Sequence, residues 1–138
     1  MPGTINSPDV IERVVTQKPR IVVVGLSPKP QRPSNDVASF LLERGFEVVP
    51  VNPRATKVLG RECYPSLDDV PGEIEVVDVF RRGEELEPIV DAAISRGAKV
   101  VWLQLGVENE EATRRAVEAG IDVVKNLCIK MEILERER

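Results

Sequence analysis

The 138-residue sequence contains no histidine and only two cysteines, and these absences narrow the chemistry open to it. Without histidine there is no imidazole base, no histidine metal ligand and no phosphohistidine, which weighs against most hydrolytic triads. Cys63 and Cys128 are far apart and form no CxxC pattern, which argues against zinc and is typical of a reducing cytoplasm. We therefore expect no metal site and no catalytic residue.

Long apolar runs and excess positive charge are also missing. No run approaches the ~20 apolar residues that cross a membrane, and the start MPGTINSPDV lacks the basic-then-apolar order of a signal peptide. The net charge of −4 does not favour a nucleic-acid partner. We expect a cytoplasmic protein with one domain over residues 1–138, and the many Glu and Arg residues are typical of a thermophile.

Short valine-rich runs alternate with amphipathic segments along the chain. This pattern predicts an α/β, Rossmann-like fold: a doubly wound sheet of five parallel strands with flanking helices in three α/β/α layers. The expected strands cover residues 21–24, 46–51, 73–80, 99–105 and 121–124. The expected helices cover residues 9–16, 37–44 after an N-cap at Ser34, 84–96, 109–119 and 127–135. Residues 54–73 read as irregular, with one helical turn at 67–70.

The stretch RIVVVGLSPKPQRPSND, residues 20–36, is the centre of the functional argument. A buried strand ends at Gly25, and a proline-rich loop leads to a helix start. Backbone amides and the positive end of a helix dipole form an anion site in such a turn. Lys29 and Arg32 add two formal charges, so the sequence predicts a ligand that carries phosphate.

A dinucleotide site would require G-x-G-x-x-G here and an acid after the second strand. The chain has Ser27 and Pro30 in place of the second and third glycines, and Arg54 follows Val51-Asn52-Pro53 where the acid would stand. Both departures argue against NAD. They agree with a nucleotide whose ribose is phosphorylated, such as NADP or coenzyme A.

From about residue 10 to 132 the chain resembles the small single-domain CoA-binding proteins, which look like the N-terminal domain of the succinyl-CoA synthetase α subunit. The resemblance rests on motifs in order: GLSPKP with Arg32 and Ser34, then VNP, LG with CYPSL, VDVFRR, VWLQ, and Asn126 with Cys128. The family often has a basic residue between that Asn and Cys, where this chain has Leu127.

The resemblance implies that coenzyme A, or an acyl-CoA, binds at the carboxyl ends of the strands without chemistry of the chain's own. Lys29 and Arg32 would meet one phosphate cluster, Arg54 the ribose phosphate, and Val51, Pro53 and Phe80 the adenine or pantetheine. The full set of expected ligand-binding residues is Gly25, Leu26, Ser27, Pro28, Lys29, Arg32, Ser34, Val51, Asn52, Pro53, Arg54, Phe80, Arg81, Arg82, Gln104 and Gly106.

Several alternatives stay open at this point. Asp78 lies inside a strand, where a buried carboxylate needs partners, and we expect it to accept hydrogen bonds from the amides of the Gly25–Pro28 loop. Alternatively, Asp78 could be the functional carboxylate of an NADP-linked or acyl-CoA-handling enzyme. Two reactive cysteines would instead suit a CoA-level or redox sensor with a protein partner, although ordinary buried thiols are the expectation. Trp102 is expected in the core. A homo-oligomer is compatible with the sequence.

Overall fold

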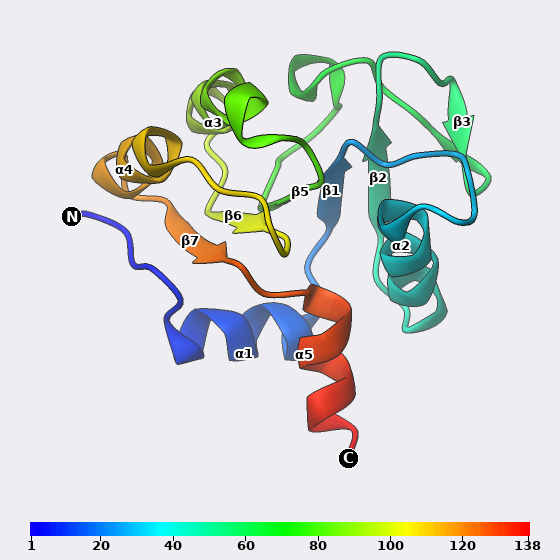
Figure 1. Ribbon diagram of the computed structural model, residues 1–138, viewed down its shortest axis with the longest axis horizontal. Helices are drawn as coiled ribbons and strands as arrows, with labels where there is room; N and C mark the ends of the chain where they lie inside the picture. The colour runs from blue at the N-terminus through cyan, green and yellow to red at the C-terminus, as the bar shows by residue number, and fades with distance from the viewer.

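Five parallel strands form the central sheet, and helices cover both of its faces (Figure 1). The computed structural model describes all residues, Met1–Arg138. The strands are β1 (Ile21–Val24), β2 (Val48–Val51), β5 (Val76–Val79), β6 (Val100–Leu103) and β7 (Asp122–Lys125), in the order β2-β1-β5-β6-β7. This arrangement confirms the predicted doubly wound α/β fold.

Alternate residues of the strands divide the core into two layers. On one face, residues such as Val23 and Trp102 pack in a cluster with α1 (Pro8–Gln17), α2 (Pro33–Glu43) and α5 (Ile129–Arg136). On the other face, residues such as Val22 and Val101 pack with α3 (Leu86–Ser95) and α4 (Glu110–Glu118). Because four of the five strands are buried at every position, valine-rich runs without alternation are stable in this sheet.

The connection between β2 and β5 is more ordered than the sequence predicts. A short antiparallel hairpin pairs β3 (Lys57–Val58) with β4 (Arg61–Glu62), and the predicted single helical turn is the 3-10 helix η1 (Leu67–Asp69). Strands of two residues are too short to show alternation, so no periodic signal marks the hairpin. Tyr64 then forms an isolated parallel bridge with Val51 and covers the outer edge of β2.

Helix α2 begins at Pro33, and the prediction that Ser34 caps it is wrong. Proline suits the first helical position because its φ is already fixed near the helical value, and because an N–H at that position would have no acceptor within the helix. Arg32 is the capping residue, with an extended backbone at φ −79° and ψ 142°, and no side chain caps the helix. Ser34 lies inside the first turn, is buried, and is free to bond to the preceding loop.

The strand order places the topological switch point of the sheet between β1 and β5. The chain leaves β1 toward α2 on one face, whereas it leaves β5 through the 3-10 turn η2 (Gly83–Glu85) toward α3 on the other face (Figure 1). Loops that diverge in this way open a ligand site at the carboxyl ends of the two strands. No helix of the chain combines the length and the apolar character needed to span a membrane.

Candidate functional site

Gly25 forms a tight turn at the switch point. Its φ is +88°, and a Cβ built there would lie 2.7 Å from the carbonyl oxygen of Phe80 at the end of β5. The Gly25 amide donates to the carbonyl of Val51, and the Phe80 amide donates to that of Val24, both at 2.9 Å. Three strand ends therefore meet at a position where only glycine fits without a shift of backbone.

Three side chains hold the loop that follows Gly25. The Ser27 amide donates to Ser34 Oγ at 3.0 Å, and Asn35 Nδ2 donates to the Ser27 carbonyl at 2.9 Å. From the end of β2, Asn52 Nδ2 donates to the Leu26 carbonyl at 3.0 Å, while its Oδ1 accepts from the Arg54 amide. Ser34 and Asn35 are buried, so the first turn of α2 fixes the shape of the loop.

This loop has backbone donors without a partner. The amides of Leu26 and Gln31 donate to no acceptor within the chain, but only Gln31 is exposed, since Leu26 is wholly buried. Both lie between the Gly25 turn and the N-terminus of the 11-residue helix α2, where the helix dipole is positive. Free amides at the positive end of a helix form an anion site.

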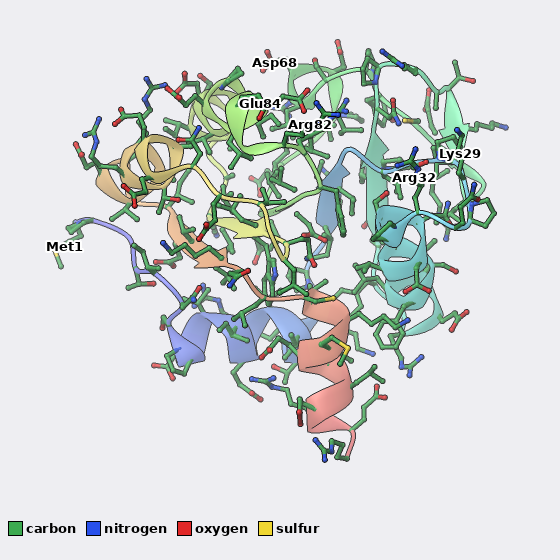
Figure 2. All side chains as sticks on the ribbon, in the orientation of Figure 1. Met1, Lys29, Arg32, Asp68, Arg82 and Glu84 are labelled. Atoms are coloured by element: carbon green, nitrogen blue, oxygen red, sulfur yellow. The ribbon has the colours of Figure 1, made fainter.

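Positive side chains without acidic partners surround the same turn. Lys29, Arg32, Arg54 and Arg81 have no carboxylate within 4.0 Å, whereas arginines on the helices, such as Arg114 and Arg136, pair with glutamates. In Figure 2, Lys29 and Arg32 extend from the loop after β1. Cations left unpaired on a chain of net charge −4 indicate a site for an anionic ligand.

The two adjacent arginines after β5 have different environments. The aliphatic part of Arg81 lies over the Gly25 turn, with Cδ 3.2 Å from the position of a Gly25 Cβ, and the residue is half-buried. The Arg82 side chain is 83% exposed, and its Nη1 lies 3.9 Å from Glu84 Oε1. Figure 2 labels both residues. Arg81 is therefore the better placed of the two for a ligand over Gly25.

The carboxyl group of Asp78 does not hold the loop, so that prediction is wrong. Asp78 is completely buried, and its Oδ1 accepts from Gln104 Nε2 at 2.6 Å, while Oδ2 has no partner. Burial raises the pKa of Asp78 to about 7 from its ordinary 3.8, and the hydrogen bond from Gln104 opposes that shift. A group with no exposed surface cannot touch a substrate in this conformation, which disfavours Asp78 as a catalytic acid or base.

Related proteins indicate which ligand binds at such a site. A family model described as a CoA binding domain matches residues 19–133. The chain belongs to the CoA-binding domain family. The predicted resemblance is thereby confirmed.

Relatives of similar size share the whole CoA-binding domain. The uncharacterised protein YneT of Bacillus subtilis is 39% identical over 121 residues, which cover 88% of this chain and 90% of YneT. A hypothetical protein from Pyrococcus horikoshii superimposes with a TM-score of 0.90 and 45% identity, covering 94% of this chain and 91% of that one.

Larger relatives contain the domain as a fraction of their length. Acetate–CoA ligase (ADP-forming) II of Archaeoglobus fulgidus is 28% identical over 98 residues, which are 70% of this chain and 15% of the ligase. A dinucleotide-forming acetyl-coenzyme A synthetase from Candidatus Korarchaeum cryptofilum superimposes with a TM-score of 0.73 and 27% identity, covering 84% of this chain and 27% of the synthetase. The CoA-binding domain is thus related to a part of acetyl-CoA synthetases.

The structure brings most of the predicted ligand-binding residues of this CoA-binding domain to the carboxyl edge, with different exposure. Leu26 and Val51 are buried in the core, backbone included, so neither faces a ligand in this conformation. Exposed or half-buried positions are Gly25, Ser27, Pro28, Lys29, Arg32, Asn52, Pro53, Arg54, Phe80, Arg81, Arg82 and Gly106, whereas Ser34 and Gln104 are buried.

The environments of the two thiols differ, and that of Cys63 disfavours a reactive thiolate. Cys63 is buried, and desolvation raises its pKa against the weak effect of a hydrogen bond to the Asn52 carbonyl. Cys128 is half-buried at the start of α5, next to Leu127, whose carbonyl accepts from Trp102 Nε1 at 2.8 Å. Trp102 is fully buried, which confirms its predicted place in the core.

Sequence reasoning missed the residues that shape the loop rather than contact a ligand. Asn35 is not among the predicted site residues, and Asn52 is predicted as a ligand contact although both ends of its amide bond to backbone. The only available signal was the SND sequence at a helix start, where Ser and Asn side chains commonly bond to backbone amides and carbonyls.

Proposed function

We propose that this chain binds coenzyme A, free or acylated, at the carboxyl edge of the sheet and carries out no chemistry on it. The observation that carries the proposal is the group of unpaired cations, Lys29, Arg32, Arg54 and Arg81, around a glycine turn with free amide donors. Coenzyme A has a diphosphate and a ribose phosphate, and several separated cations suit those charges better than a single one. Membership of the CoA-binding domain family supports this ligand.

The residues of the edge fit such a ligand part by part. The missing Cβ of Gly25 lets the Phe80 carbonyl and the aliphatic part of Arg81 pack closely against the turn, which keeps Arg81 beside the loop, where its charge suits a diphosphate. Arg54, exposed and without an ion pair after β2, is suited to the ribose phosphate. Asn52, which stands near the position of the acid in NAD sites, has both polar atoms bonded to backbone and offers no carboxylate to ribose hydroxyls.

Calorimetric titration with CoA, acetyl-CoA, NAD and NADP tests the proposal. We expect saturable 1:1 binding of CoA and no detectable binding of NAD. In the variant Lys29→Ala/Arg32→Ala we expect CoA affinity to fall at least tenfold, because two charge-assisted contacts to phosphate are lost. The matched control is Lys99→Ala. It removes an exposed, unpaired cation just before β6, at the amino ends of the strands and away from the proposed site.

The outcomes separate the competing functions. NAD binding as tight as CoA binding would contradict the proposal, and so would an equal loss of CoA affinity in the double variant and in Lys99→Ala. NADP binding that exceeds CoA binding would favour an NADP-linked enzyme, for which Arg54 is the supporting observation, because an arginine after the second strand can accept a ribose 2′-phosphate.

Turnover is tested separately with acetyl-CoA. We expect no release of free thiol above the rate without protein, because Asp78, the strand carboxylate near this edge, is wholly buried and the chain has no histidine to act as a base. The ligase and synthetase relatives are more than three times as long as this chain, and the activities in their names belong to those whole proteins. Hydrolysis of acetyl-CoA that Asp78→Asn abolishes, with CoA affinity unchanged, would establish an enzyme instead.

A further inference from the structure

A buried carboxyl group lies directly below the proposed ligand-binding edge, and only one of its two oxygen atoms has a hydrogen-bond partner. Asp78 is the third residue of β5, between Val23 of β1 and Trp102 of β6. Its Oδ1 accepts from Gln104, and its Oδ2 is the only buried side-chain nitrogen or oxygen atom in the chain without a partner. A buried polar atom without a partner is costly, so it marks a position with a specific role.

No charged group of the surrounding elements compensates Asp78. Its neighbours along β1 and β6 are apolar or neutral, and charged side chains of α1, α2 and α5 lie outside the core. Asp36 of α2 pairs with Lys130 of α5, and Glu12 of α1 pairs with Arg136 of α5. The remaining charged residues of these helices, Asp9, Arg13, Glu43, Glu132 and Glu135, are exposed or half-buried, as is the thiol of Cys128.

Gln104 links this carboxyl group to the ligand edge. It follows the last residue of β6 and is 4% exposed, and no group of the chain donates to its Oε1. Because Nε2 is held by Asp78, the amide of Gln104 is fixed in one orientation. Phe80, at the end of β5, lies two residues beyond Asp78 on the same face, which corresponds to about 7 Å along a strand.

We propose that Asp78 is a positioning residue that acts through Gln104 and makes ligand binding at this edge proton-linked, an inference that rests on the proposed CoA function. The protonated carboxyl group holds Gln104 without placing a charge under the ligand. Phosphates bound at the Gly25 loop disfavour the ionised carboxylate, because like charges repel and the wholly buried Asp78 is little screened by solvent. Binding therefore takes up a proton, and affinity falls as the pH rises.

The raised pKa of Asp78, about 7, puts this effect in the neutral range. If bound phosphates raise it by about one further pH unit, CoA should bind roughly fivefold more tightly at pH 6 than at pH 8 through this group alone. The ligand's own phosphate also titrates near pH 6. That contribution is the same for every protein variant and cancels when variants are compared.

The experiment measures CoA affinity at pH 6, 7 and 8 for the wild type, for Asp78→Asn and for Asp68→Asn. Asn at position 78 keeps an oxygen acceptor for Gln104 and stays neutral at every pH. Asp68 is exposed in η1 and serves as the matched control for removal of one carboxylate. We expect the wild type and Asp68→Asn to share the additional fivefold dependence, and Asp78→Asn to bind CoA without it.

A second measurement needs no folded variant. The carboxyl carbon of Asp78 in the wild type, followed by NMR, should titrate near pH 7 and shift to higher pH when CoA is added. A titration midpoint below pH 5, or identical pH profiles for the wild type and Asp78→Asn, would overturn the inference and leave CoA binding intact. Absence of CoA binding by folded wild type at every pH would instead overturn the proposed function, and the inference with it.

Discussion

Substitution of Gly25 by alanine should lower the free energy of unfolding for two separable reasons: the left-handed backbone and the close approach of the Phe80 carbonyl. At φ +88° any residue with a Cβ loses roughly 1–2 kcal/mol. The added Cβ also meets the Phe80 carbonyl oxygen at 2.7 Å, and this oxygen cannot rotate away because it belongs to the backbone at the end of β5. Overpacking of this kind costs about 1–3 kcal/mol more, which gives a total of about 2–5 kcal/mol.

Gly97→Ala is the matched control. Gly97 has a similar φ of +71°, but nothing lies within 4 Å of the position that its Cβ would occupy. Alanine should therefore cost only the conformational part there, and the reduced entropy of the unfolded chain changes equally in both variants. Urea unfolding monitored by circular dichroism measures both free energies, provided the m-values agree. We also expect Gly25→Ala, and not Gly97→Ala, to lose CoA binding at least tenfold. Equal destabilisation of the two variants would refute the close-approach argument.

Three further predictions concern the same edge. The pKa of Asp78 is about 7 in the folded protein and 3.8 ordinarily, so the unfolded chain loses this proton at lower pH. The free energy of unfolding should therefore fall by about 3 kcal/mol between pH 4 and pH 7, and Asp78→Asn should lack this fall in denaturant titrations. Asn52→Ala removes two bonds to backbone, so we expect a loss of about 1–3 kcal/mol in thermal or urea unfolding and weaker CoA binding. CoA affinity should fall steadily from 0.05 to 0.5 M NaCl in calorimetry, since Lys29 and Arg32 are exposed; a salt-independent affinity would contradict the phosphate site.

The strands were predictable because burial on both faces leaves a direct mark in the sequence. The run Ile21–Val24 is β1 without a residue of difference, since four β-branched residues suit an extended, doubly buried segment. The predicted strands at 46–51 and 73–80 are longer than β2 and β5. Apolar residues such as Phe46 and Ile74 continue into the core beyond the hydrogen-bonded ladder, so hydrophobicity alone does not define where pairing ends.

Polar partners were less predictable, because they depend on which elements become neighbours. The prediction that Asp78 bonds to the Gly25 loop follows from the β1–β5 pairing alone. In the structure β6 lies on the other side of β5, and the register that pairs Asp78 with Trp102 brings Gln104, two residues further along, onto the same face within reach of the carboxyl group. Ser34 shows the same limit: its sequence context suits a helix cap, yet its hydroxyl accepts from Ser27 because Pro33 already begins the helix.

Three departures from ordinary protein construction occur at the carboxyl edge of this sheet. At the amino ends, Arg20 and Arg96 both donate to backbone carbonyls of residues 67–73 and are thereby satisfied. At the carboxyl ends, Gly25 is in a conformation closed to other residues, Asp78 keeps an unpaired buried oxygen, and cations of the β1 loop have no acid partner. Each feature costs stability or leaves an interaction unmade, and such costs are expected where function rather than folding determines the residue. Their coincidence at the switch point supports the proposal that the ligand binds at this edge, and it does so without reference to the family relationship.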